Sequence, residues 1–295
     1  MALHPFTQVD VFGRTGLSGN PLAVVHEAGD LDDARMADFA RWTNLSETTF
    51  LLPPTESGRA GGADYRVRIW TPAGELPFAG HPTLGSAHAW LAAGGEPARA
   101  GSVVQECAAG IVGLRHDAEA GRLAFAAPPQ VRSDAPTEEE LAGALRALDL
   151  EPSHVRGARW IDNGPGWFGL WLDDAATVDA VRPDAAAFAG WKIGIAGPVH
   201  EPSGSGQGTE APADIRVRGF FADGDSGFFM EDPVTGSLNA SLGQWLIGEG
   251  ELPAAYTAQQ GVAIGHDGLV HVERVGEDLW VGGATRTVIT GSVDL

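Results

Sequence analysis

The stretch Ala63-Asp64-Tyr65-Arg66-Val67-Arg68 decides the fold of this chain, because nearly the same residues return as Ala213-Asp214-Ile215-Arg216-Val217-Arg218. Downstream of the first copy comes Gly80-His81-Pro82-Thr83-Leu84-Gly85-Ser86, and downstream of the second comes Asp232-Pro233-Val234-Thr235-Gly236-Ser237. In both places a strand-like segment, a loop with proline and threonine, and a helical segment follow in the same order. An internal repeat of this kind determines the architecture before any single element is assigned.

A weaker third match lies near the start of each copy. Val9-Asp10 precedes Gly19-Asn20-Pro21-Leu22 much as Ile161-Asp162 precedes Gly164-Pro165-Gly166-Trp167. Chance could produce one such match, whereas three matches in the same order indicate a duplicated unit. The sequence therefore predicts two homologous halves.

Both halves combine many strand-like segments with few helices. Asp32 is placed to cap a helix to about Thr43, and Thr137-Glu138-Glu139-Glu140 forms a capping box that opens a helix to about Leu148. A long helix is expected after Thr235. Residue patterns predict strands at 6–12, 21–26, 47–52, 65–71, 102–107, 111–116 and 122–126, and short strands from 262 to the C-terminus. This content predicts an α+β fold of two domains, residues 1–130 and residues 131–295, each a curved sheet around a central helix. The last strands of the chain could return to the first domain.

The composition limits the classes of function. The 295 residues suit two domains of ordinary size, and no apolar run is long enough to cross a bilayer. A formal net charge of −20 argues against nucleic-acid binding, which needs clustered Lys and Arg. The N-terminal residues lack the pattern of a secretion signal, and the single cysteine, Cys107, cannot form an internal disulfide, so a cytoplasmic location is expected. The single lysine, Lys192, has no recognisable cofactor context, which argues against pyridoxal-phosphate or Schiff-base chemistry.

Two features that resemble binding motifs predict no site. The run Gly204-Ser205-Gly206-Gln207-Gly208 fits neither the dinucleotide pattern nor the phosphate-loop pattern, so a mobile surface loop is expected there. The nine histidines are scattered, and none forms a pair at metal-ligand spacing. We therefore expect no metal and no nucleotide cofactor.

The two turns that open the central helices are candidates for a ligand site. In Gly80-His81-Pro82-Thr83 a proline stands where the first helical residue is expected, and Asp232-Pro233 repeats this device. Free backbone N–H groups at helix starts bind carboxylates or phosphates, and small residues such as Gly236 allow close approach. If the halves pair through a pseudo-two-fold axis, both turns face one cleft, with His81, Asp232 and Ser237 around an anion. Singly, these residues also fit a turn histidine, a helix cap and a surface serine.

Glu47 is the candidate for acid/base work. It lies in Asn44-Leu45-Ser46-Glu47-Thr48-Thr49-Phe50, at the start of a predicted strand that follows a helix. A carboxylate among apolar neighbours can have a raised pKa, which general acid/base catalysis near neutral pH requires. An exposed glutamate on an edge strand is the alternative interpretation.

Several separated motifs resemble those of the PhzF-like isomerase family of phenazine biosynthesis. The resemblance lies in Phe6–Phe12, Gly19–Val25, Asn44–Phe50, Phe78–Thr83, Glu231–Ser237 and the Val281-Gly282-Gly283 region, and it spans nearly the whole chain. It implies the diaminopimelate-epimerase fold: two similar domains with mostly antiparallel sheets, related by a pseudo-two-fold axis, often in a homodimer. The two helix starts carry no cysteine, which excludes the two-thiol mechanism of that epimerase.

The resemblance also implies roles for the site residues. It identifies Glu47 as the residue that moves a proton within a small cyclic carboxylic acid, such as trans-2,3-dihydro-3-hydroxyanthranilate. His81 and Asp232 would then hold amine or hydroxyl groups, while Gly80, Gly236 and Ser237 would bind the substrate and its carboxylate. Two other functions stay open: a cofactor-independent epimerase or racemase of an amino or hydroxy acid, and a non-catalytic small-molecule binding protein of the same fold.

Overall fold

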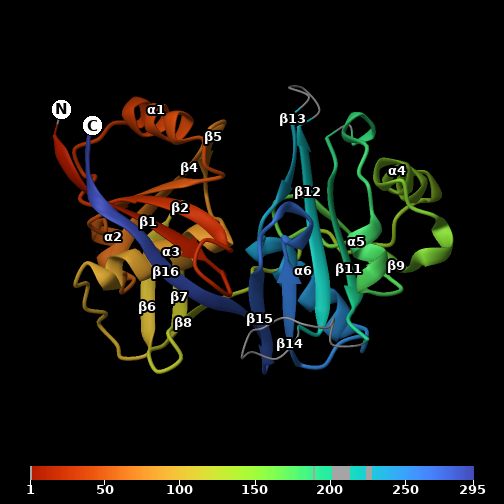
Figure 1. The fold of residues 1–295 in the computed structure, drawn as a ribbon. Helices are drawn as coiled ribbons and strands as arrows, with labels where there is room; N and C mark the ends of the chain where they lie inside the picture. The colour runs from red at the N-terminus through yellow and green to blue at the C-terminus, as the bar shows by residue number, and fades with distance from the viewer. Residues whose placement is uncertain (1, 189, 201–212, 224–227) are drawn as a thin grey trace. The chain divides into compact units, whose positions relative to one another are not determined.

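The computed structural model describes residues 2–188, 190–200, 213–223 and 228–295 (Figure 1). The glycine-rich run 204–208, expected to be a mobile loop, lies outside the described residues. The chain divides into two compact units, which are described separately: unit 1 is Met1–Ala126 with Gly282–Leu295, and unit 2 is Ala127–Val281.

Unit 1 is a closed barrel around one helix. Its strands are β1 (Leu3–Val11), β2 (Asn20–Val25), β3 (Thr48–Leu52), β4 (Tyr65–Thr71), β5 (Gly74–Leu76), β6 (Ser102–Cys107), β7 (Gly110–Asp117), β8 (Arg122–Ala126) and the C-terminal part of β16 (Asp278–Asp294). They follow the order β1-β2-β3-β4-β6-β7-β8-β16, and β16 pairs again with β1, which closes the barrel. Helix α3 (Gly80–Ala92) packs inside against β1, β2, β3 and β8 (Figure 1).

Unit 2 repeats this scheme with an open sheet. Its strands are β9 (Val155–Trp160), β10 (Trp167–Leu172), β11 (Lys192–Pro198), β12 (Ile215–Asp223), β13 (Phe228–Asp232), β14 (Ala255–Gln260), β15 (Gly268–Val275) and the first residues of β16. The pairs β10–β11 and β12–β14 are parallel, as β2–β3 and β4–β6 are in unit 1, and β13 pairs with β12 as β5 pairs with β4. Helix α6 (Gly236–Gly248) packs against β10 and β15. The order of pairings thus confirms that the fold is duplicated.

The smaller helices lie outside the sheets. They are α1 (Asp33–Thr43), α2 (Glu56–Ala60), α4 (Glu138–Leu148) and α5 (Ala175–Ala180), with 3₁₀ turns at Pro152–His154, Ala185–Ala187 and Val262–Ile264. The last of these turns corrects the expected strand at residue 262. Gly261 and Gly265 flank it with φ values of 93° and 82°, a left-handed conformation that breaks the extended chain.

The central helices owe their position to composition. Both α3 and α6 have 13 residues, apolar or small on nearly all sides, and most of these are buried. A helix without a polar face can only be stable inside a core. Small residues allow the close packing, since a Cβ added at Gly85 would lie 2.5 Å from Leu22 of β2.

Matched aspartates stabilise matched turns. Asp10 accepts hydrogen bonds from the backbone N–H groups of Ser18 and Gly19, and Asp162 accepts them from Gly164 and Gly166. The weakest of the three sequence matches therefore reflects a real equivalence. The shared aspartate satisfies backbone groups that the turn between two strands would leave without partners.

The two turns that open the central helices correspond in a register different from the one expected. Ile69 of β4 pairs with Leu76, whereas Gly219 of β12 pairs with Asp232. Because Ile69 and Gly219 occupy the same place in the repeated strand, Asp232 matches Leu76. The alignment of His81-Pro82 with Asp232-Pro233, which would make His81 and Asp232 equivalent, was therefore wrong.

The helix starts give the same register. Helices α3 and α6 begin at Gly80 and Gly236, so His81 matches Ser237. The expectation of proline as first helical residue was also wrong, because Pro82 is the third residue of α3 and Pro233 precedes α6 altogether. A proline anywhere in the first turn lacks only an N–H that has no acceptor within the helix.

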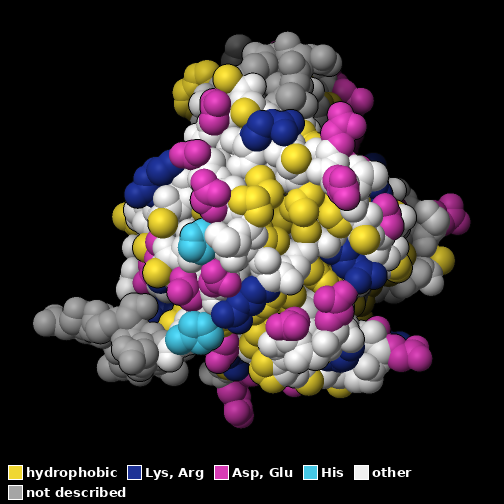
Figure 2. All heavy atoms as spheres, turned by 90° about the vertical axis from the view of Figure 1, so that its right-hand side faces the viewer, with side chains coloured by type: hydrophobic (Ala, Val, Ile, Leu, Met, Phe, Trp, Pro, Cys, Tyr) yellow, Lys and Arg dark blue, Asp and Glu magenta, His cyan; other side chains and the backbone are white. Residues whose placement is uncertain are grey.

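The acidic side chains do not gather on one patch of the face drawn in Figure 2, where Asp and Glu are spread among the other types. None of the helices in the described part of the chain is long and apolar enough to span a membrane.

Candidate active site

Glu47 is held in a tight turn between α1 and β3. Asn44, the C-cap of α1, has a left-handed conformation with φ of 53°, which ends the helix and redirects the chain. The hydroxyls of Thr43 and Thr48 lie 2.9 Å apart and tie the two ends of this turn together. The turn places Glu47 immediately before the buried start of β3, with a side chain that is only 16% exposed. The alternative of an exposed edge glutamate is thereby removed.

His81 is the direct neighbour of Glu47. Its Nε2 atom lies 3.3 Å from Oε2 of Glu47, and its side chain is buried as the second residue of α3. Burial lowers the pKa of His81 to about 3, so its imidazole is neutral near pH 7. The contact is an approach within ion-pair distance and not a hydrogen bond, because Nε2 of His81 is buried without a hydrogen-bond partner among the described residues. The pair therefore places a buried ring nitrogen, which a ligand can engage, directly beside the carboxyl group of Glu47.

Acid is expected to destabilise the protein through His81. The folded-state pKa lies below the unfolded value of 6.5, so the unfolded chain binds the proton first. The stability contributed by neutral His81 is complete above about pH 6.5 and is lost, on the order of a few kcal/mol, as the pH falls toward 3. Urea titrations of wild type and His81→Gln across this range should show a steeper pH dependence in the wild type. Parallel curves would contradict the assignment.

The starts of the two central helices differ from the other α-helix starts. Helices α1, α2, α4 and α5 are each capped by a side chain that accepts from a backbone N–H: Asp32, Thr55, Thr137 and Asp174. Helices α3 and α6 follow Ala79 and Thr235 without any side-chain cap. The first N–H groups of α3 and α6, at Gly80 and Gly236, therefore remain available to an anion, to which the helix dipole adds attraction.

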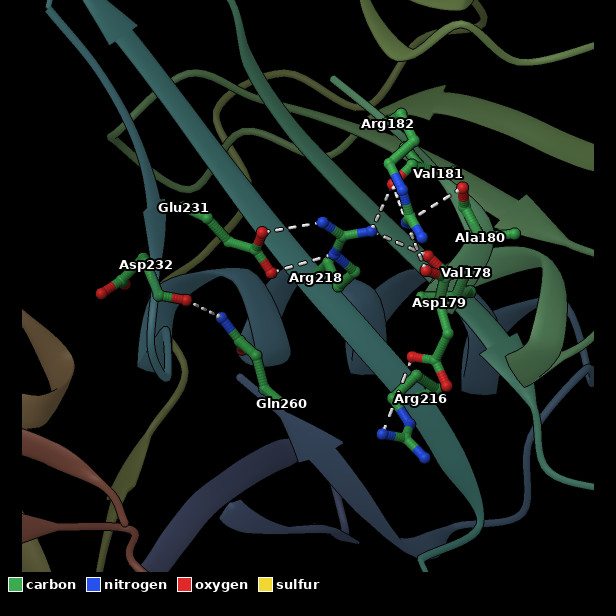
Figure 3. Close-up of polar contacts among 10 residues, drawn as sticks. All are labelled: Val178, Asp179, Ala180, Val181, Arg182, Arg216, Arg218, Glu231, Asp232 and Gln260. Atoms are coloured by element: carbon green, nitrogen blue, oxygen red, sulfur yellow. Dashed lines mark hydrogen bonds and ion pairs between the residues drawn. The ribbon is translucent and has the colours of Figure 1, made fainter. Parts of the chain in front are cut away.

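Asp232 ends β13 and is held through its backbone and its side chain. The hydroxyl of Thr235 donates to its Oδ2 atom over 2.6 Å. Nε2 of Gln260 donates to its backbone carbonyl over 3.0 Å (Figure 3). Gln260 also accepts from the backbone N–H of Thr235 and from Asn239 of α6. Gln260 thus ties the end of β13 to the start of α6.

The hydroxyl of Ser237 is oriented by a neighbouring side chain. Nε1 of Trp167 donates to its Oγ atom over 3.0 Å, and Asn163 donates to its backbone carbonyl over 3.0 Å. Because the oxygen accepts from the indole, the hydroxyl hydrogen is free to turn toward a ligand. Trp160 packs against the core of unit 2, whereas Trp167, seven residues further on, also donates to Ser237.

A buried ion pair supports the strand that carries Asp232. Arg218 of β12 makes two hydrogen bonds to Glu231 of β13, of 2.9 and 2.8 Å, and both side chains are under 10% exposed. Its guanidinium also donates to the carbonyls of Val178 and Val181 at the end of α5 (Figure 3). Glu231, the residue before Asp232, is therefore held by Arg218, and Arg218 is itself held by α5.

The structure brings the candidate residues together in two groups. Unit 1 assembles Glu47, Gly80 and His81, and unit 2 assembles Asp232, Gly236 and Ser237. Sequence reasoning missed the supporting residues Asn163, Gln260 and Thr235. Among the sequence signals, only the third internal match, Ile161-Asp162 before Gly164-Pro165-Gly166-Trp167, lies in the region that supplies supporting residues. Among the described residues no group of three or more His, Cys, Asp and Glu is placed to hold a metal ion.

Solved structures define the class of fold. A phenazine biosynthesis protein of the PhzF family from Enterococcus faecalis superposes with a TM-score of 0.79 at 22% identity, over 100% of both chains. A hydroxyproline epimerase from Agrobacterium vitis superposes with a TM-score of 0.54 at 12% identity, over 99% of this chain and 92% of that one. At these identities the likeness establishes the fold alone, which is the diaminopimelate-epimerase-like α+β fold.

The family follows from the sequence comparisons. The profile of the family described as phenazine biosynthesis-like protein, PhzC-PhzF, matches residues 9–291, and the chain belongs to this family. Antisense-enhancing sequence 1 of Schizosaccharomyces pombe is 39% identical over 183 residues, 60% of each chain. Trans-2,3-dihydro-3-hydroxyanthranilate isomerase of Pseudomonas aeruginosa is 36% identical over 188 residues, 63% of each chain. These two matches span less than two thirds of either relative. Isomerase PM1503 of Pasteurella multocida, whose activity is uncharacterised, is 30% identical over 98% of this chain and 94% of its own length.

Proposed function

We propose that this chain is a cofactor-independent isomerase that moves a proton within a small, cyclic carboxylic or amino acid, as trans-2,3-dihydro-3-hydroxyanthranilate isomerase does. The observation that carries the proposal is the contact of Glu47 with the neutral ring of His81 beside the uncapped start of α3. A positioned carboxylate can remove a proton from an allylic carbon or a carbon next to a carbonyl when donors hold the developing charge.

In this mechanism Glu47 removes a proton from one ring carbon and returns it to another. His81 remains neutral throughout, since its pKa of about 3 keeps it from taking the proton permanently. Its buried Nε2 atom, which has no hydrogen-bond partner among the described residues, would instead hold and polarise a substrate hydroxyl or amine beside the carboxyl group of Glu47. Glu47 therefore carries the proton between the two transfers, and exchange of this carboxyl proton with solvent allows deuterium from D₂O to enter the product.

The unit 2 residues would bind the rest of the substrate. Asp232 accepts from Thr235, and a carboxylate has further lone pairs that can hold a substrate amine. The hydroxyl of Ser237 and the backbone N–H groups of Gly236 and Ser237 would bind the carboxylate. We include a homodimer and a cytoplasmic location in the proposal by analogy with the family; sedimentation equilibrium would check the former.

The second candidate function is an epimerase or racemase. It needs one acid/base group on each face of a carbon, and Asp232, whose carboxylate is already oriented by Thr235, would be the second group after Glu47. The isomerase and the epimerase differ in product alone, because the first moves a double bond and the second inverts a centre. A non-catalytic binding protein would neither move a double bond nor invert a centre in the ligand.

Proton NMR in D₂O tests the proposal. The protein is incubated with trans-2,3-dihydro-3-hydroxyanthranilate and a panel of small cyclic amino and hydroxy acids. Deuterium entering a ring position with loss of one vinyl signal identifies an isomerase, whereas deuterium at an inverted centre with unchanged double bonds identifies an epimerase. Binding without any exchange across the panel would favour the non-catalytic alternative.

Trp167→Phe is expected to weaken substrate binding. Without the indole N–H that donates to its oxygen, the hydroxyl of Ser237 loses its orientation. KM should therefore rise about fivefold, which corresponds to the free energy of one neutral hydrogen bond, and kcat should change little. The matched control is Trp171→Phe on the same strand, where the lost partner is Glu251. Equal KM values for the two variants would contradict a binding role for Ser237.

A further inference from the structure

Strand pairing shows which residue of unit 2 corresponds to the acid/base carboxylate of unit 1. In unit 1, Thr48 of β3 pairs with Trp70 of β4, and in unit 2, Ile193 of β11 pairs with Phe220 of β12. Trp70 and Phe220 stand at the same place in the repeated strand, two residues after its final arginine. Thr48 and Ile193 are therefore equivalent, and so are the residues that precede them.

Those preceding residues are Glu47 and Lys192. Glu47 contacts His81 of α3. Lys192 points to the same face of β11 as Gly194, because side chains two apart on a strand share a face. A Cβ added at Gly194 would lie 2.1 Å from Leu238 of α6, so this face is the one covered by the central helix. The single lysine of the chain thus occupies in unit 2 the place of the proposed acid/base residue in unit 1.

The surroundings of Lys192 suit an anion. On the parallel neighbour β10 it pairs with Trp167, whose indole donates to Ser237. Its Nζ atom lies 4.9 Å from the centre of the Phe221 ring, and the side chain is partly buried. Burial lowers the pKa of Lys192, an effect that the negative charge of Asp162 opposes. Across the described parts of the chain, no carboxylate comes within ion-pair distance of the ammonium group.

We propose that Lys192 is a further substrate-binding residue, which pairs with the carboxylate of the substrate next to Ser237. The inference rests on the proposed function for the identity of the substrate. The same position of the repeat would then have a different role in each unit. In unit 1 a carboxylate moves a proton, and in unit 2 an ammonium group binds the negative charge of the substrate. A purely structural role, in which the aliphatic stem packs on Phe221, is the competing interpretation.

The single lysine makes a direct test available. Protein labelled with ¹³C at lysine Cε, with a lysine-free tag, gives one Cε–Hε signal, and Lys192→Arg confirms its identity by removing it. The probes are anthranilate and its uncharged analogue anthranilamide, titrated into wild type and Glu47→Gln. Anthranilate should shift the signal and raise the pKa of Lys192, because a nearby negative charge favours the ammonium form. Anthranilamide should do neither. A signal that stays unmoved, or that responds equally to both probes, overturns the proposal.

Affinities give the second readout. Lys192→Met keeps the stem against Phe221 and should weaken anthranilate binding about 10- to 100-fold, as expected for a charge-assisted hydrogen bond, while anthranilamide binding changes little. Lys192→Arg should recover most of the loss. Failure of the proposed function is recognised separately: Glu47→Gln would then exchange deuterium like the wild type, whatever the lysine signal shows. Equal losses for both probes in Lys192→Met would mean a structural role only.

Discussion

Glu47→Gln is expected to lower kcat/KM for proton exchange by about 10²- to 10⁴-fold, the usual contribution of a general acid/base group. Glutamine keeps the size of the side chain and a polar contact to His81, but it cannot accept and return a proton. The loss should fall on kcat, since the groups proposed to bind the substrate carboxylate are untouched. Deuterium incorporation followed by NMR, with anthranilate affinity measured in parallel, separates the two effects.

The matched control for this substitution is Glu249→Gln. Glu249 is an exposed carboxylate paired with Arg159, so its loss should leave exchange within about twofold of the wild type. If Glu47→Gln exchanges deuterium as fast as the wild type, Glu47 is not the proton carrier. Asp232 would then be the next residue to replace.

Glu231→Gln is expected to destabilise the fold by about 3–5 kcal/mol, because it leaves the guanidinium of Arg218 buried without its counter-charge. Both side chains are under 10% exposed, so water cannot take the place of the lost carboxylate. The carbonyls of Val178 and Val181 still accept from Arg218 but do not neutralise it. Urea denaturation at pH 7 measures the difference in unfolding free energy.

The duplicated fold supplies the control for this second prediction. Arg68 and Glu75 of unit 1 make the same two-bond pair at the matching register, but they are 16% and 30% exposed, and Arg68 has a second carboxylate partner in Asp33. Glu75→Gln should cost no more than about 1 kcal/mol, as for other solvated pairs. Equal effects of the two substitutions would show that neither burial nor a second counter-charge governs the cost of losing the glutamate.

Elements governed by local residues were predicted closely. Asp32 caps α1, which ends at Thr43, and the capping box at Thr137 and Glu140 opens α4, which ends at Leu148. These signals act within three or four residues of the chain, so they are written in the sequence directly. The repeated strands β4 and β12 were likewise visible because burial selects the same residue types at the same spacing.

The register between the two halves could not be predicted in the same way. Aligning the sequences on proline and threonine matched His81 to Asp232, whereas the strand pairing matches His81 to Ser237 and Glu47 to Lys192. The segment that joins the repeated strand to the central helix differs in length between the two units. Only the hydrogen-bonded partners across the sheet therefore define which residues correspond. No local pattern records a partner on another strand.

By itself the sequence determined the family and the duplicated α+β fold, and it supplied the candidate site residues, because repeats, caps and residue types are local properties. Only the tertiary structure decided the environment of those residues. It buries His81 against Glu47 and so keeps the imidazole neutral, it directs the indole N–H of Trp167 to the hydroxyl of Ser237, and it places Nζ of Lys192 4.9 Å from the centre of the Phe221 ring. Proton affinity and orientation depend on distance and burial, and these exist only once residues far apart in the chain have packed together.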